Sequence, residues 1–331
     1  MFKKRIAVVL IFISLITTLS GCGRPTFNEG ITIRVGHVLA PDHPYTDGLK
    51  MFAKLVSEKT NGKVTVDVFH SSQLGGERDM IEGLQLGTLE MALVSTAPLS
   101  DFTQKFLVFD LPFIFKDAES ARKVVDGPIG NELFQALDGQ QIKGLAYWEN
   151  GFRSVTNNKG PIETPEDMRG LKIRTMENPV QMASFKSLGT SPSPMAFGEL
   201  FTALQQKTID GQENPLPIVD TSKFYEVQDY LSLTEHFYAP APLLISNKFY
   251  NSLTPEIQQA LREAAVEARD YERGLIDESN AKLIPELEKR GMKVNYPDKQ
   301  PFIDAVQPVY KKFANVISPE LVQRVIDAQE K

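Results

Sequence analysis

The first third of the chain alternates between short apolar strands and amphipathic helices. Apolar side chains recur at every second position in segments 31–37, 64–68 and 90–95, which predicts three strands. Between them, apolar residues recur at helical spacing, in one helix that Asp47 is expected to cap and in a second that follows Gly76. The resulting order, β-α-β-α-β, is typical of an α/β fold with a mostly parallel sheet.

Later strands indicate a second unit that is continuous with the first. Strand-like segments occur at 142–148, 152–156, 170–175, 208–210, 228–233 and 242–246. No linker rich in glycine, serine or charge separates the two halves of the chain. We therefore expect strands that cross between two lobes. Lobe I would comprise 31–150 plus about 240–275, and lobe II 151–239 plus about 276–331.

One long helix is predicted in the last third of the chain. Thr254 and Pro255 form a helix start, and apolar residues keep a helical spacing from there toward Arg290. At about 1.5 Å per residue this helix would be roughly 55 Å long, more than the diameter of one small domain. We expect it to brace both lobes, with a kink at Pro285.

The N-terminus has the pattern of an export signal. Three basic residues precede an apolar run from 6 to 19, which is short for a membrane span. The next residues, Leu19-Ser20-Gly21-Cys22, resemble the bacterial lipobox, in which the signal is removed before a cysteine that is then lipidated. We expect a signal peptide at 1–21, a lipid anchor on Cys22 and a tether at 22–30, with the rest of the protein outside the cytoplasm.

Composition and charge narrow the class of ligand. The chain has 331 residues, 42% of them hydrophobic and 24% charged, which is the composition of a globular protein with a sizeable core. Loss of the three basic residues near the N-terminus would move the formal net charge from -6 to -9. This charge argues against nucleic acid as a partner. An anionic ligand would therefore need a local cluster of arginines. The single cysteine excludes an internal disulfide.

Templates for catalysis and cofactor binding are absent from the sequence. It contains no G-x-G-x-x-G, no G-x-x-x-x-G-K-[ST], no H-E-x-x-H and no G-x-S-x-G, and its four histidines lack the spacing of metal ligands. We therefore expect no cofactor and no metal. An alternative of another class is an extracytoplasmic enzyme on acidic sugars, with Asp210 and Glu213 as its acid pair.

Arg174 is the central candidate for ligand binding. Segment 164–167 has a hydroxyl cap, a proline and two acids, which is typical of a helix start. Leu171 and Ile173 then alternate with basic residues as in a strand, and a helix is predicted at 178–189. This order places Arg174 at the carboxyl end of a strand, where ligands of open α/β sheets bind. An arginine there can hold a carboxylate through two parallel hydrogen bonds.

Two other segments bring suitable chemistry. Arg153 is a second arginine, at the start of a strand that follows Trp148. Asn214 follows another strand, in the segment Gln212-Glu213-Asn214-Pro215, and its amide can both donate to and accept from a ligand oxygen. Together with Arg174 these residues would form a site for an organic acid.

These segments carry a resemblance to a known family. The chain resembles the substrate-binding subunit of TRAP transporters, the tripartite ATP-independent periplasmic (DctP) family, over nearly all of its length after the signal. The matching segments are Ser72-Gln73-Leu74-Gly75-Gly76-Glu77-Arg78, Asn150-Gly151-Phe152-Arg153, Arg169-Gly170-Leu171-Lys172-Ile173-Arg174, Pro194-Met195-Ala196-Phe197 and Asp210-Gly211-Gln212-Glu213-Asn214-Pro215. The resemblance implies an α/β fold of two periplasmic-binding-protein-like lobes with mostly parallel sheets, which close on one ligand and are braced by a long helix.

The resemblance also implies roles for individual residues. Arg174 matches the arginine that binds the ligand carboxylate, and Arg153 matches a second arginine of the site. Asn214 and Phe197 match a polar and an aromatic ligand contact. Glu77 matches an acidic position that binds ligand hydroxyls in some members of the family.

Three further positions follow from the same comparison. Ser95 occupies the place of an acid in sialate-binding members, which makes a sialic acid ligand unexpected, and His37 and Tyr238 lie on binding loops. A small organic acid and the TRAP membrane permease are the implied partners. Because Glu77 would repel a second carboxylate, the preferred ligands are sugar acids such as the hexuronates D-glucuronate and D-galacturonate. C4-dicarboxylates, with Arg153 on the second carboxylate, are the alternative.

Overall fold

The structure, a computed structural model, describes residues 30–330. The expected signal peptide, the tether up to residue 29 and the expected lipid anchor on Cys22 lie outside the described residues. Within 30–330, none of the helices combines the length and the apolar character needed to cross a bilayer.

A single mixed sheet of nine strands runs through both lobes, in the order β2-β1-β3-β8-β4-β7-β5-β6, with β9 beside β8. The strands are β1 (Ile31–Gly36), β2 (Val64–Phe69), β3 (Met91–Leu93), β4 (Ile142–Asn157), β5 (Lys172–Thr175), β6 (Ser191–Pro194), β7 (Gly211–Asn214), β8 (Tyr230–Ser246) and β9 (Lys293–Asn295). The short strands pair in parallel with one another, as in β1 with β3 and β5 with β6 and β7, whereas β3 is antiparallel to β8 and β7 is antiparallel to β4. The predicted two-lobed α/β fold is therefore confirmed.

Two long antiparallel strands join the lobes, which confirms the predicted crossing. β4 has 16 residues and β8 has 17, and they pair over nearly their whole length. The sequence pattern predicted two separate strands in place of each. For β4, shifts in its register with β8 explain this difference. One shift lies between Glu149 and Gly151, where Gly151 adopts a φ of 103°. Such a bulge interrupts the alternation of buried and exposed positions.

Two local predictions were wrong. No strand forms at 208–210; the strand β7 begins after this segment, at Gly211. The carboxylate of Asp210 accepts the backbone N–H of Lys172 at 2.9 Å, which holds 208–210 in the turn before β7. Asp47 does not cap the first long helix. That helix begins at Pro44, and the ring Nδ1 of His43 accepts the N–H of Tyr45 at 3.2 Å. A proline in the first helical position has a φ already suited to the helix, so the helix starts earlier than the acid indicates.

The helices cover this sheet and connect its strands. They are α2 (Pro44–Lys59), α3 (Glu77–Leu86), α4 (Ala118–Asp126), α5 (Pro128–Gln135), α6 (Pro179–Ser187), α7 (Phe197–Gln205), α8 (Leu216–Thr221), α9 (Asn247–Ser252), α10 (Pro255–Lys289), α11 (Gln300–Phe313) and α12 (Pro319–Ala328). Short 3-10 helices lie at η1 (Ala97–Asp101) and η2 (Gln104–Asp110), between β3 and α4. Near the C-terminus, α11 packs on α6 and α12 packs on α4.

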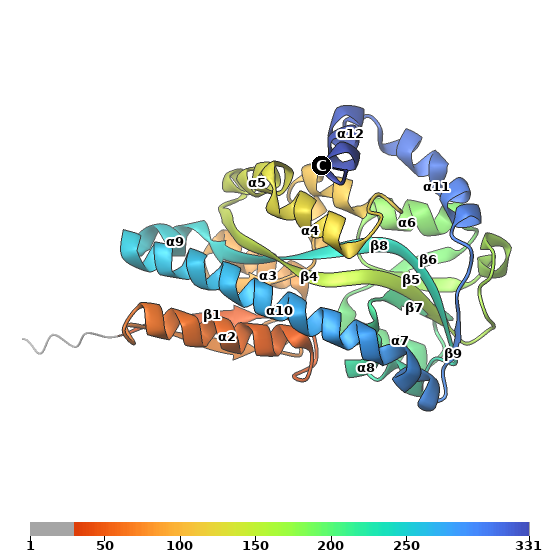
Figure 1. Ribbon diagram of the computed structural model, residues 1–331, viewed down its shortest axis with the longest axis horizontal. Helices are drawn as coiled ribbons and strands as arrows, with labels where there is room; N and C mark the ends of the chain where they lie inside the picture. The colour runs from red at the N-terminus through yellow and green to blue at the C-terminus, as the bar shows by residue number, and fades with distance from the viewer. Residues whose placement is uncertain (1–29, 331) are drawn as a thin grey trace, which may run out of the picture. The chain divides into compact units, whose positions relative to one another are not determined.

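The long helix α10 is continuous over 35 residues, with Pro285 inside it. It runs diagonally past the β4–β8 pair, beside α2 toward one end and beside α8 and β9 toward the other (Figure 1). In the first lobe, the ring N–H of Trp148 donates to the carbonyl of Ala265 at 3.1 Å. In the second lobe, Arg290 forms an ion pair with Asp220. The helix therefore braces both lobes, as predicted.

The crossing of α2, β4 and α10 leaves no room for an added methyl group, so we expect Gly48→Ala to destabilise the protein. A Cβ atom on Gly48 would lie 2.6 Å from Cζ3 of Trp148 and 2.9 Å from Cβ of Glu272. Overpacking of this kind costs about 1–3 kcal/mol in free energy of unfolding, measurable by urea denaturation. The matched control is Gly274→Ala within α10, where a Cβ meets nothing within 4 Å. Equal stability of Gly48→Ala and wild type would contradict this packing.

Candidate functional site

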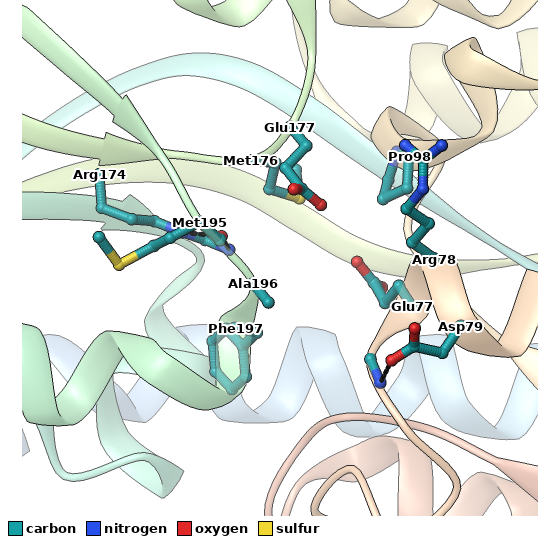
Figure 2. Close-up of a pocket in the computed structure, with 11 residues that line it drawn as sticks. Glu77, Arg78, Asp79, Pro98, Arg174, Met176, Glu177, Met195, Ala196 and Phe197 are labelled. Atoms are coloured by element: carbon teal, nitrogen blue, oxygen red, sulfur yellow. Dashed lines mark hydrogen bonds between the residues drawn. The ribbon is translucent and has the colours of Figure 1, made fainter.

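A pocket with an accessible volume of about 180 Å³ lies between the two lobes. Its lining combines the start of α3 with η1 on one side and the ends of β5 and β6 with the start of α7 on the other. The lining residues are Gly76, Glu77, Arg78, Asp79, Pro98, Arg174, Met176, Glu177, Met195, Ala196 and Phe197. Figure 2 shows Glu77 facing the space opposite Arg174 and Phe197.

Arg174 stands in β5, and its side chain is held in a fixed direction. Nε and Nη2 both donate to the carbonyl oxygen of Met195, at 3.0 and 2.8 Å. The guanidinium carbon lies 6.0 Å from the centre of the Phe197 ring, a cation–π distance. Burial lowers the pKa of Arg174 to about 10, so the group is still a cation near neutral pH. No described residue accepts a hydrogen bond from Nη1. The Nη1 side of the guanidinium is therefore available to bind a carboxylate.

Glu77 supplies an acidic group on the other side of the pocket. It is the first residue of α3, where a carboxylate is favoured by the helix dipole. Its Oε1 accepts the backbone N–H of Ser95 at 2.6 Å. Burial raises the pKa of Glu77, while the Ser95 N–H and the charges of Arg174 and Arg153 oppose the rise. The carboxyl group can therefore accept hydroxyl donors, and it repels a further carboxylate whenever it is ionised.

Arg153 is buried in a hydrogen-bonded network and does not line the pocket. Its Nε and Nη2 donate to the two carboxylate oxygens of Glu213 at 2.5 and 2.8 Å, and both residues are almost fully buried. Nη2 also donates to Oδ1 of Asn214 at 3.0 Å. Burial alone would raise the pKa of Glu213, but Arg153 and His236 lower it to about 2. The charge of Arg153 is thus balanced inside the protein.

His236 completes this network from β8. Its Nε2 lies 3.3 Å from Oε2 of Glu213, and its Nδ1 lies 2.8 Å from the hydroxyl of Thr234. Burial lowers the pKa of His236 despite the neighbouring carboxylate. As a neutral ring it can donate from Nε2 to Glu213 and accept from Thr234 at Nδ1.

The structure brings only some of the expected residues to the pocket. Arg174, Glu77 and Phe197 line it, whereas Arg153, Asn214, Ser95, His37 and Tyr238 are buried outside its lining.

Ser95, His37 and Tyr238 each contact other protein groups outside the pocket lining. Ser95 binds Glu77 through its N–H, and its hydroxyl accepts from Asn150 at 3.1 Å. His37 contacts the hydroxyl of Thr46 through Nε2 at 3.2 Å, and burial lowers its pKa to about 3. Tyr238 packs edge-on against Phe115 and Phe152, and its buried hydroxyl has no partner among the described residues.

The sequence did not identify several residues that line the pocket. Met195 acts through its backbone carbonyl, and Met176 follows the end of β5, so neither presents a chemical signal in its side chain. Arg78 and Asp79 follow Glu77 at the start of α3, and their charges could have been read as part of the site. Arg78 pairs with Asp101, and Asp79 accepts the N–H of Gly76 at 2.8 Å.

The two acids of the enzyme alternative are occupied elsewhere. Asp210 accepts the N–H of Lys172 and pairs with Lys159 at 3.2 Å, while Glu213 holds Arg153. Neither lines the pocket. Among residues 30–330 there is also no group of three or more His, Cys, Asp or Glu side chains placed to hold a metal ion.

A pocket between two lobes, with a buried arginine on one side and a carboxyl group on the other, is suited to a receptor for small acids, and the comparisons with known proteins agree. The family of bacterial extracellular solute-binding proteins, family 7 (DctP), matches residues 35–316, and the chain belongs to it. Members are receptors of TRAP transporters that act outside the cytoplasm, with membrane permease subunits as partners.

Individual relatives resemble this chain over most of its length. A TRAP periplasmic solute-binding protein from Polaromonas sp. JS666, solved with bound D-erythronate, is 42% identical with a TM-score of 0.88, covering 89% of this chain and 98% of the other. The 2,3-diketo-L-gulonate-binding periplasmic protein YiaO of Escherichia coli K12 is 39% identical, covering 83% and 84% of the two chains. The C4-dicarboxylate-binding periplasmic protein DctP of Rhodobacter capsulatus is 35% identical, covering 91% and 92%.

Proposed function

We propose that this receptor is anchored by a lipid on Cys22 and that its ligand is a sugar acid with a single carboxylate. The observation that supports the ligand class is the charge balance of the site. Arg174 has no carboxylate partner among the described residues, whereas Arg153 is neutralised by Glu213 at 2.5 Å. The anchor rests on the resemblance of Leu19-Ser20-Gly21-Cys22 to a lipobox.

The charge balance favours sugar acids over dicarboxylates. One carboxylate on Arg174 would meet a pocket cation that has no carboxylate partner among the described residues. Arg78, which also lines the pocket, is already paired with Glu82 and Asp101. A second carboxylate would lie near Glu77 or would have to compete with Glu213 for Arg153, and both arrangements cost electrostatic energy in a buried site. Hydroxyl groups, in contrast, can donate to Glu77. Two of the relatives above bind sugar acids and one binds C4-dicarboxylates, so the dicarboxylates are the alternative within the family.

In this proposal, ligand binding draws the two lobes together. Lobe I would comprise 31–150 plus about 240–275, and lobe II 151–239 plus about 276–331. A carboxylate on Arg174 and hydroxyls on Glu77 would link the two sides of the pocket, because these residues face each other across it. Since the ligand makes both sets of contacts only in the closed form, it shifts the population toward that form. The closed form would then be recognised by the permease.

A ligand panel with Glu77→Gln tests the ligand class. We expect D-glucuronate, D-galacturonate, D-galactonate and D-erythronate, but not succinate or neutral sugars, to raise the melting temperature of the wild type at pH 7.5. At 100 times the dissociation constant the stabilisation is about 2.7 kcal/mol, a shift of several degrees. Because the variant lacks the repelling charge, it should gain a response to succinate.

The control for this experiment is Glu119→Gln, which removes an exposed carboxylate outside the pocket. It should respond like the wild type. If succinate stabilises the wild type more than every sugar acid does, the dicarboxylate alternative is correct and the charge argument fails.

A further inference from the structure

A buried carboxyl group joins the segment before α4 to the start of α6. Asp110 ends η2, in the half of the chain that also contains Glu77, and it is only 4% exposed. Its two oxygens accept from side chains of α6 in the other half: Oδ2 from Nδ2 of Asn178 and Oδ1 from Nε2 of Gln181, both at 2.9 Å. The two amides are themselves 1% exposed. Asp110 thus joins a segment of the first half of the chain to the start of α6 in the second half.

Asn178 ties this contact to the ligand-binding arginine. Its Oδ1 caps α6 by accepting the N–H groups of Val180 and Gln181 at 2.9 and 3.0 Å. Its Nδ2 lies 3.1 Å from the carbonyl of Ala97 as well, so the lobe I segment surrounds the start of the helix. Only three residues separate Asn178 from Arg174. A displacement of the α6 start would therefore move the strand end that carries Arg174.

We propose that Asp110 is a positioning residue for ligand capture, which clasps the start of α6 and so holds Arg174 in its ligand-binding arrangement when the lobes are closed. This inference rests on the proposed function, because it concerns the same site. Neither the pocket lining nor the sequence resemblance includes Asp110, Asn178 or Gln181.

The charges around Asp110 make the clasp sensitive to pH. Burial raises the pKa of Asp110 to about 7; the hydrogen bonds from Gln181 and Asn178 and the charge of Arg153 on β4 oppose the rise, and the charge of Glu213 on β7 adds to it. On β8, His236 lies within hydrogen-bond distance of Glu213, and burial lowers its pKa, which favours the neutral ring. Between η1 and α6 the facing polar group is the hydroxyl of Ser100, which does not titrate in this range.

The direction of the pH effect follows from proton linkage. When the lobes separate, water reaches the carboxyl group and its pKa returns toward the ordinary 3.8. The closed form therefore binds a proton that the open form releases between about pH 4 and 7, and closure is favoured as the pH falls through 7. The protonated group can keep a bond to α6, because Oε1 of Gln181 is buried without a partner among the described residues and turns toward Asp110 when the amide rotates.

The experiment measures affinity of the full chain for D-galactonate and D-glucuronate by calorimetry at pH 8 and pH 6. Wild type should bind about tenfold more tightly at pH 6, because a closed-state pKa near 7 gives that ratio of protonated forms. Asp110→Asn, which is always neutral, should show a change below about twofold and bind at pH 8 about as tightly as the wild type does at pH 6. Gln181→Met, which removes one donor, should shift the midpoint of the profile to higher pH. Glu119→Gln should follow the wild type.

A second readout needs no ligand. Amide hydrogen exchange of residues 175–184, corrected for its intrinsic pH dependence, should be slower at pH 6 than at pH 8 in wild type and equal at both in Asp110→Asn. If affinity and exchange change with pH equally in wild type and Asp110→Asn, the Asp110 carboxyl group does not titrate with closure and the pH-sensitive clasp is wrong. Binding of neither acid by the wild type would count against the proposed ligand class, while the exchange comparison would still decide the role of Asp110.

Discussion

Arg174→Ala should abolish the stabilisation of this protein by sugar acids. Removing one partner of a buried charge pair typically costs about 2–5 kcal/mol, which weakens binding by about 30-fold to several thousand-fold. The loss should be large here because Arg174 is 3% exposed and is held by two hydrogen bonds to Met195, so its guanidinium is already oriented for a carboxylate. Calorimetry with D-galactonate and D-glucuronate measures the dissociation constants.

Two variants control this result. Arg169→Ala removes an exposed arginine five residues upstream in the same segment and should bind as the wild type does. Arg174→Lys keeps the charge but loses the planar fork, so its affinity should lie between those of wild type and Arg174→Ala. A full response of Arg174→Ala to both acids would show that the carboxylate binds elsewhere.

Glu213→Ala should strongly destabilise the protein. It leaves Arg153, which is 1% exposed, as an uncompensated buried cation. Breaking a buried pair in this way costs about 3–5 kcal/mol, which corresponds to a melting temperature lower by roughly 10 °C for a protein of this size. The double variant Arg153→Met/Glu213→Ala should recover part of the loss, because no charge is then left unpaired.

The Arg153–Glu213 pair should also affect how the stability of the protein depends on pH. The pKa of Glu213 is lowered from 4.5 to about 2 in the folded protein, so the folded state binds fewer protons than the unfolded state in this interval. Its contribution to stability is complete above about pH 4.5 and is lost as the pH falls toward 2. The double variant should therefore lose less free energy of unfolding between pH 5 and pH 3 than the wild type. Parallel acid denaturation curves would show that the pair does not contribute in this way.

In the folded protein, Arg153 is not a free cation. As a free cation it would be suited to a second ligand carboxylate, which is how a dicarboxylate could bind. In the structure Glu213, Asn214 and His236 surround it and balance its charge. We expect its contribution to ligand binding to depend on this network, with Arg174 supplying the cation that meets the ligand.

Much of the fold could be predicted because its signals are local. The 35-residue helix α10 is recognisable from a cap, a proline and a sustained apolar spacing, all of which belong to consecutive residues. The same is true of Arg174 at the end of β5, where four residues alternate before a helix start at Asn178. Prediction from local signals failed for β4, which the pattern divided into two strands. The bulge near Gly151 interrupts the alternation of side chains and so conceals that the strand is continuous.

By itself, then, the sequence determined the alternation of strands and helices in the first third, the long helix α10, the two-lobed class and the arginine at a strand end, because periodicity and capping depend on neighbouring residues. Tertiary structure alone decided which charges remain free. Arg153 meets Glu213 across 60 positions, and Asp110 meets Asn178 across 68. Such pairs depend on strand register and on how the lobes pack, and local spacing carries no information about either. The cation available to a ligand is therefore defined only in the folded protein.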